Sequence, residues 1–230
     1  MFLASLNPSG KAVEVLLAHG VDITLGTKET GYIQHYAAVC ATAASIQFLE
    51  EHKLSLFSED MSKKTPLMWW ATSAHPSKEV LDLLLSSYAK AQIDAVDTTK
   101  YSALHHFCMH HNIASKDAAQ WVVEALIVSK KAKMTQVAGW DKHTPLGLAA
   151  TSGDAALVEA MVELVPRLNL NKGDKYGRTP LLMAARNGHA NIVALLMKHH
   201  AKASIPDTSG NTPLHYAAAY GWLECVHVLL

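Results

Sequence analysis

The densest group of chemically active side chains lies at residues 105–111, where the sequence reads HHFCMHH. Imidazole and thiolate groups are ligands that Zn²⁺ prefers in proteins, so this segment could bind a metal. On a helix, His106 and His110 would share one face, as metal-binding histidine pairs do. No second pair of ligands lies nearby in the sequence, however. We therefore interpret the segment as ordinary helix residues and predict no metal, and we keep a metal-dependent module as an alternative.

Catalytic patterns do not stand out elsewhere in the chain. The sequence contains neither a G-x-S-x-G nucleophile turn nor the glycine-rich loops that hold phosphates. Acidic pairs such as Glu50–Glu51 and Glu59–Asp60 are typical of solvated helix ends and turns, where Asp side chains bond nearby backbone. The sequence therefore predicts no catalytic residue and no cofactor, and the chain is not expected to be an enzyme.

Composition and charge narrow the classes of protein to which the chain can belong. The chain has 230 residues, of which 50% are hydrophobic, and its 20 basic residues balance its 20 acidic residues. A net charge of zero does not favour direct contact with nucleic acid. No apolar run reaches the length of about 18 residues that a membrane span needs. The cysteines, Cys40, Cys108 and Cys225, are too few and too far apart for a disulfide framework, which predicts an intracellular protein, cytoplasmic or nuclear.

One phrase recurs along the chain and sets the positions of all these residues. Thr-Pro-Leu begins at Thr65, Thr144, Thr179 and Thr212, a weaker copy begins at Ser102, and a degenerate one begins at Tyr32. Successive copies start 33, 37, 42, 35 and 33 residues apart. Such self-similarity predicts a repeat architecture.

Each position of the phrase has a physical role in a helix-turn-helix unit. Thr caps a helix, Pro suits its first turn, and the following Leu packs inward. An alanine pair lets helices approach closely, and a glycine such as Gly188 ends the first helix in a left-handed conformation. Val and paired apolar residues then form the stripe of a second helix. An Asp five residues before the Thr or Ser marks a hairpin turn, at Asp60, Asp97, Asp174 and Asp207.

Residues 175–196, KYGRTPLLMAARNGHANIVALL, and residues 210–219, GNTPLHYAAA, resemble the ankyrin repeat. The resemblance implies an all-α solenoid of stacked helix-turn-helix units with short hairpin loops. It places His105 in the slot of a structural histidine that bonds loop backbone, and Cys108 in a slot for a small packed residue. We predict a single array over 1–230, with a partial unit at 1–26 and units at about 27–59, 60–96, 97–138, 139–173, 174–206 and 207–230, the last truncated.

Two features depart from the repeat. The unit from Asp97 carries extra residues around 112–117, so its second helix is expected over 121–127; we interpret the insertion as a surface loop, with a dedicated contact as the alternative. Trp70 replaces an alanine, which predicts local repacking or a kinked binding surface. Because the chain begins and ends within a repeat, we expect it to be a piece of a longer protein.

The resemblance also implies a function, because hairpin tips and first helices of the family line a concave groove that binds proteins. Exposed aromatic and arginine side chains are typical anchors of such interfaces. The partner is expected to be a protein or peptide, acidic or phosphorylated, since the predicted surface is rich in basic residues. A rival interpretation makes the chain the regulatory or targeting arm of a kinase, ubiquitin ligase or ADP-ribosyl transferase. The predicted binding residues are Tyr101, Trp140, His143, Lys175, Tyr176, Arg178, Arg186, Asn187, Tyr220 and Trp222.

Overall fold

The computed structural model describes residues 15, 19, 33–40, 46, 51, 55–73, 76–110, 116–129, 132–134 and 136–230. Contacts divide the chain into two compact units, residues 1–107 and 108–230. The division falls inside helix α8 (Ala103–His110), after Phe107. The unit boundaries expected from the repeat remain predictions, and the partial unit at 1–26 lies almost wholly outside the described residues.

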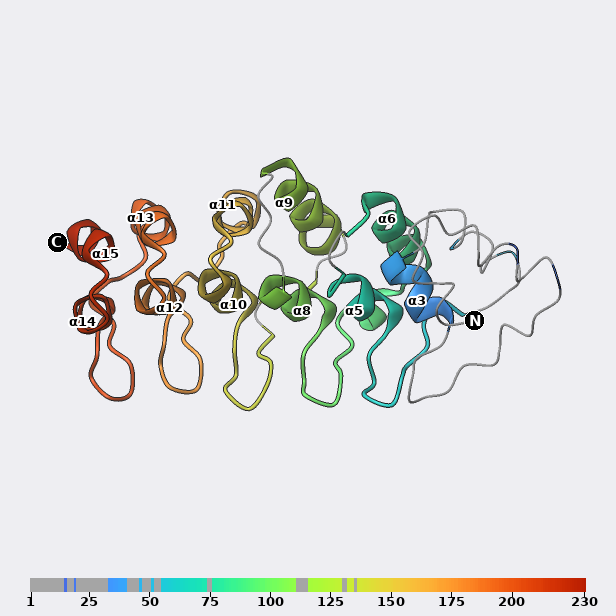
Figure 1. Ribbon diagram of the computed structural model, residues 1–230, viewed down its shortest axis with the longest axis horizontal. Coiled ribbons are helices and arrows are strands. Elements are labelled where there is room, and N and C mark those ends of the chain that lie inside the picture. Colours follow the sequence, from blue (N-terminus) through green and yellow to red (C-terminus); the bar gives the residue numbers. More distant parts are fainter. Residues whose placement is uncertain are drawn as a thin grey trace. The chain divides into compact units, whose positions relative to one another are not determined.

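The second unit consists of two layers of helices (Figure 1). Helices α10, α12 and α14 form one layer, in which α12 packs against both neighbours. Helices α9, α11, α13 and α15 form the other layer, and hairpin loops project from the α10–α14 side. The bounds are α9 Lys116–Val122, the π-helix η1 Val123–Ser129, α10 Pro145–Ser152, α11 Ala155–Leu164, α12 Pro180–Arg186, α13 Ala190–Lys198, α14 Pro213–Ala219 and α15 Leu223–Leu229.

The first unit contains α3 (Ile33–Cys40), α5 (Pro66–Trp70), α6 (Lys78–Ser87), the short α7 (Lys90–Ile93) and the start of α8. Helix α3 packs against α5, and α5 contacts α6. Trp70 is fully buried and stacks on Phe107, with ring centroids 5.5 Å apart and planes inclined by 6°. Its indole Nε1 donates to the Ser77 carbonyl at 3.0 Å. Trp70 is therefore a core residue whose ring and N–H both have partners, and the two interpretations of its place in the repeat stay predictions.

The threonine caps are confirmed by their geometry. The hydroxyls of Thr65, Thr144 and Thr179 accept hydrogen bonds from the backbone N–H three positions later, at 3.3, 3.1 and 3.2 Å. At Thr212 a histidine takes part instead, because the Thr212 N–H donates to His215 Nδ1 at 3.1 Å. The capping residue thus starts each of these first helices at the position that the phrase predicts.

The glycines between paired helices are also confirmed. Gly153, Gly188 and Gly221 have φ values of 83°, 79° and 75°, which only glycine adopts without cost. They turn the chain directly from α10, α12 and α14 into the second helix of each pair. The described residues contain helices and one isolated bridge, Ala138–His143, but no strand, so the predicted all-α array of stacked helix pairs with hairpin loops is confirmed.

Three details differ from the prediction. Leu214 was expected to pack inward like Leu181, yet it is half-exposed, whereas Leu181 is fully buried. The reason is that α12 packs between α10 and α14, whereas the main contacts of α14 are with α12 and α15. Helix α7 was not predicted. The helix expected over 121–127 instead runs from Lys116 to Ser129, and its second half is π-helical.

The predicted apolar stripe of that helix is nevertheless buried, at Val123, Leu126 and Ile127. A π-helix has a wider turn than an α-helix and often accompanies an extra residue in the chain. Most of the insertion itself, residues 111–115, lies outside the described residues.

Candidate functional site

The hairpin loops are built around the recurrent aspartates. In each of these four aspartates, the carboxylate oxygen Oδ1 accepts hydrogen bonds from the backbone N–H groups two and four positions later. For Asp174 the donors are Tyr176 and Arg178, at 2.9 and 3.0 Å. Equivalent bonds of 2.8–3.0 Å hold the turns at Asp60, Asp97 and Asp207. The prediction that these aspartates shape turns is therefore confirmed.

The second oxygen of each aspartate bonds a side chain, a feature that the sequence analysis missed. Three times the donor lies nine residues later, on the first helix: Trp69 bonds Asp60 at 3.0 Å, His106 lies 2.8 Å from Asp97, and Tyr216 bonds Asp207 at 2.8 Å. This bond fastens a hairpin to the helix that follows it. The ninth residue after Asp174 is Met183, which cannot donate, and Arg178 takes the place through Nε at 2.7 Å and Nη2 at 2.6 Å.

Neighbouring hairpins within a unit are joined through their backbones. In the second unit Lys175 N–H donates to the Asp141 carbonyl and Thr208 N–H donates to the Tyr176 carbonyl, both at 2.8 Å. In the first unit Thr98 N–H donates to the Ser62 carbonyl at 2.9 Å. These bonds hold successive loop tips in register, so the side chains at the tips form a continuous surface within each unit.

The tips of the second unit carry a group of charged residues, the tip cluster, defined as Asp141, His143, Asp174, Lys175 and Arg178. Lys175 Nζ lies 2.8 Å from Asp141, and Arg178 Nη2 lies 3.9 Å from the same carboxylate. The hydrogen bond from Lys175 lowers the pKa of Asp141. Arg178 and His143 are predicted binding residues, and their side chains are only 14% and 18% exposed.

His143 lies between two carboxylates without forming a close bond to either. Its ring nitrogens are 3.7 Å from Asp141 and 3.9 Å from Asp174. Burial lowers the pKa of His143, and it outweighs the opposite effect of the two carboxylates. The tip cluster is thus internally compensated, with two cations facing two carboxylates.

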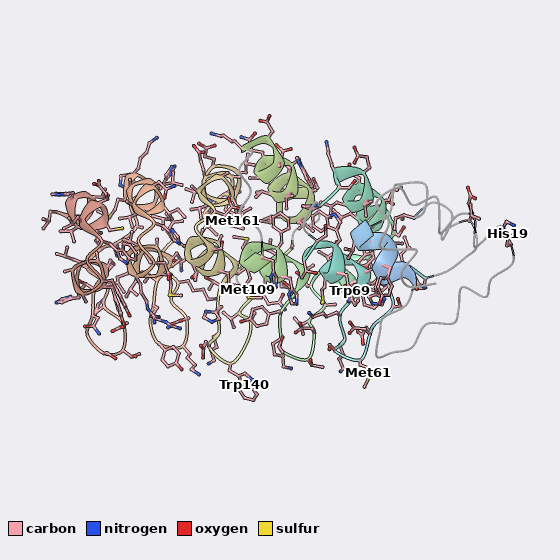
Figure 2. All side chains as sticks on the ribbon, viewed as in Figure 1. His19, Met61, Trp69, Met109, Trp140 and Met161 are labelled. Carbon is pink, nitrogen blue, oxygen red and sulfur yellow. The ribbon has the colours of Figure 1, made fainter. Side chains whose placement is uncertain are left out.

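Two aromatic side chains stand on this scaffold. Tyr176 is 41% exposed, and Lys175 Nζ and Arg178 Cζ each lie 4.7 Å from its ring centroid. Trp140 is 91% exposed and projects from its hairpin (Figure 2). A tryptophan exposed to this degree is uncommon, because its large apolar surface is normally buried. The tips therefore combine paired charges with apolar side chains available for contact.

A second surface lies at the ends of α12 and α14, here called the Arg–Tyr face: Arg186, Asn187, Tyr216 and Tyr220. Arg186 Cζ lies 5.8 Å from the Tyr216 ring centroid, and the rings of Tyr216 and Tyr220 are nearly parallel, with centroids 6.3 Å apart. Asn187 Nδ2 donates to the Met183 carbonyl at 2.8 Å. Tyr220 is 54% exposed.

The two remaining predicted residues have structural contacts. Trp222 Nε1 donates to the Arg186 carbonyl at 3.0 Å, and the indole lies over Gly188, where an added Cβ would be 2.6 Å from it. Trp222 thus helps to join two successive repeats.

Tyr101 lies in the first unit and is half-buried. Its ring lies 6.0 Å from that of His105 and 5.7 Å from that of His106.

The histidine-rich segment forms part of the packing of α8. His105, His106 and Cys108 are buried, whereas His110 is exposed, and His111 lies outside the described residues. The pair His106 and His110 is therefore divided between interior and surface. His105 Nδ1 lies 2.7 Å from the Ser102 hydroxyl, and burial raises the pKa of the Cys108 thiol. Within the described part of the chain, no three His, Cys, Asp or Glu side chains are placed to share a metal ion.

The histidine of the degenerate first copy of the phrase, in the slot equivalent to His105, bonds loop backbone. His35 Nε2 lies 2.9 Å from the Lys64 carbonyl in the hairpin of the next repeat. This contact between a first-helix histidine and loop backbone is the one that the resemblance implied for this slot.

Comparisons with known proteins agree with this architecture. The family model of ankyrin repeats (3 copies) matches residues 111–207 and 161–230. The poly [ADP-ribose] polymerase tankyrase of Caenorhabditis elegans is 31% identical over 240 aligned positions, which cover 98% of this chain and 10% of that protein.

Two further relatives give the same picture. The ankyrin repeat protein nuc-2 of Neurospora crassa is 26% identical over 100% of this chain and 20% of its own length. The human transient receptor potential cation channel subfamily A member 1 is 37% identical over 39% of this chain and 8% of its own. The chain thus spans between about a twelfth and a fifth of the length of these relatives.

Among the described helices, none has the length and apolarity to cross a bilayer.

Proposed function

Because the chain belongs to the ankyrin-repeat family, we propose that its second unit binds a partner protein or peptide on the surface formed by the hairpin tips and the first helices. Ankyrin repeats are protein–protein interaction modules, and the proposal assigns that role to particular side chains. The observation that carries it is Trp140, 91% exposed at the end of a hairpin. Exposed aromatic groups next to ordered charges are typical of binding anchors.

The ten predicted residues fall into three groups under this proposal. Trp140, Tyr176, Arg186 and Tyr220 would contact the partner directly, because their side chains are available on the surface. Residues that already bond neighbouring groups would position those contacts. The positioning residues are His143, Lys175, Arg178, Asn187 and Trp222, while Tyr101 contributes to the first unit alone.

Site-specific photocrosslinking tests the proposal. A benzophenone amino acid at position 140 is expected to form covalent adducts with partner protein in cells, and Tyr176→Ala is expected to reduce them. The same group at Leu223, which is 70% exposed on α15, is the control. Identical adducts from positions 140 and 223 would contradict the proposed surface.

A second candidate function is that of a targeting or regulatory arm of a multidomain enzyme. It is favoured by the tankyrase relative, whose name is that of an enzyme and of which this chain matches 10%. We propose that any catalytic domain lies outside these residues. The mass of the native protein tests this candidate, and a product near 25 kDa would contradict it.

Compartment and partner type complete the proposal. Cys108 and Cys225 are free and buried, as suits an intracellular, reducing compartment. We propose a protein ligand and no direct contact with nucleic acid, because the cations Lys175 and Arg178 are paired with carboxylates of the chain itself. The partner is expected to be acidic or phosphorylated, and we propose that the Arg–Tyr face is the surface that binds its acidic side chain.

A further inference from the structure

Arg186 differs from the other arginine of the candidate surface in having its charge uncompensated. Arg178 bonds Asp174 and faces Asp141, so its positive charge is compensated by carboxylates of the hairpins. Arg186 forms no ion pair with any residue of the described chain, and its guanidinium lies 5.8 Å from the Tyr216 ring centroid. A half-buried cation beside an aromatic ring is poorly hydrated. The binding of an anion to such a cation is therefore more favourable than its binding to a fully solvated cation.

The ring beside Arg186 is held in place by the hairpin. The Tyr216 hydroxyl donates to Asp207 at 2.8 Å, while Asp207 accepts two backbone N–H groups of its own turn. Tyr216 in turn lies parallel to Tyr220, at 8° and 6.3 Å. The arrangement thus presents a cation and an exposed tyrosine that both lie against the Tyr216 ring. Because its bond to Asp207 holds that ring in place, the ring has little side-chain entropy left to lose on binding.

We propose that the Arg–Tyr face binds an extended segment of a partner protein in which an Asp or Glu side chain stands next to an apolar side chain. The carboxylate bonds the Arg186 guanidinium, and the apolar side chain packs on Tyr220. This inference rests on the proposed protein-binding function and assigns the chemistry of its ligand.

A carboxylate suits the site better than a phosphate. Phosphorylated residues are usually bound by several converging cations. Here Lys175 and Arg178 already pair with Asp141 and Asp174, which leaves a single guanidinium for the ligand. One guanidinium fork matches the two oxygens of one carboxylate and balances its single charge.

An array of immobilised 12-residue peptides tests the proposal with the full 230-residue chain. The peptides have random flanks and one fixed central pair: Glu-Leu, Gln-Leu, phosphoserine-Leu, Lys-Leu or Glu-Ser. The wild-type chain is expected to retain Glu-Leu peptides about tenfold better than Gln-Leu peptides, the ratio for one charged hydrogen bond. Tyr220→Ala is expected to abolish the preference for Glu-Leu over Glu-Ser while the preference for Glu over Gln remains.

Charge-matched variants identify the residue responsible. Arg186→Gln is expected to remove the preference for Glu over Gln, whereas Lys198→Gln, on the exposed side of α13 in the same repeat, keeps it. Arg186→Lys retains the charge without the fork and is expected to show a reduced preference. Thermal melts of the variants show that each is folded.

Several outcomes would overturn the inference. A preference for phosphoserine over Glu, or a preference for Glu that survives in Arg186→Gln, contradicts it while leaving the proposed protein binding intact. Failure of the wild-type chain to retain any peptide, together with no adduct at position 140, would contradict the proposed function and the inference with it.

Discussion

The carboxylate of Asp97 and the imidazole of His106 lie 2.8 Å apart, joining the hairpin of one repeat to its first helix in a fully packed environment. Burial by itself would raise the pKa of Asp97. Hydrogen bonds from Thr99, from the Tyr101 backbone and from His106 outweigh it, and the pKa is lowered. Three of the recurrent aspartates make the same type of bond nine residues ahead, so this contact is a structural element of the repeat.

The Asp97 contact makes stability depend on pH. A lowered pKa means that the contribution is present above the unfolded value of about 3.9 and is lost as the pH falls through the folded value. Asp97→Asn is expected to lower the free energy of unfolding by about 1.5–3 kcal/mol at pH 7. Its difference from wild type should shrink below a pH of about 4. Urea melts across this range measure both effects, with Asp82→Asn, at an exposed position of α6, as the control. An equal loss at every pH would contradict the assignment.

Core and cap contributions can be ranked within one repeat. Leu181 is fully buried, so Leu181→Ala is expected to cost about 2–5 kcal/mol through the cavity it leaves. Thr179→Ala removes the 3.2 Å cap bond to Leu182 N–H and is expected to cost about 1 kcal/mol. Leu214→Ala, at the equivalent but half-exposed position, should cost less than Leu181→Ala. Chemical denaturation gives the order, and a cap variant less stable than Leu181→Ala would show that the register is wrong.

Two equivalent glycines separate backbone strain from crowding. Gly188 and Gly221 have similar left-handed φ values, but an added Cβ at Gly188 would lie 2.6 Å from the Trp222 ring, whereas one at Gly221 would meet no described residue within 4 Å other than its chain neighbours. Gly221→Ala is expected to cost about 1–2 kcal/mol, for the left-handed conformation alone. Gly188→Ala should cost about 1 kcal/mol more. A double-mutant cycle with Trp222→Ala should recover that difference, and purely additive losses would exclude the contact.

Left-handed lysines occupy the hairpin position that glycine fills elsewhere. Lys100 has a φ of 70°, close to the 75° of Gly177 in the later hairpin. Lys100→Gly removes a conformational cost of about 1–2 kcal/mol and adds a chain-entropy cost of about 0.5–1 kcal/mol. We expect a net gain of about 0.5 kcal/mol in the free energy of unfolding. Lys198→Gly, at the last helical residue of α13, should be destabilising in the same melts.

Residue types and their spacing are sufficient to predict the repeat, its caps and its turns. Thr179 bonds an N–H three residues away, Asp174 bonds N–H groups two and four residues away, and Gly188 ends a helix by its own φ. Interactions of such short range depend on residue type and spacing alone, because the backbone between the partners has only a few conformations.

Packing between repeats, in contrast, sets which of the predicted binding residues remain available for a partner. Arg178 and Arg186 are both predicted binding residues, yet Arg178 is bound to Asp174 and faces Asp141, more than thirty residues away, while Arg186 contacts the Tyr216 ring and forms no ion pair with a described residue. The half-exposure of Leu214 likewise depends on what packs beside it. Pairing between repeats depends on stacking distance and on side-chain rotamers, and neither is encoded in the spacing of residues along one unit.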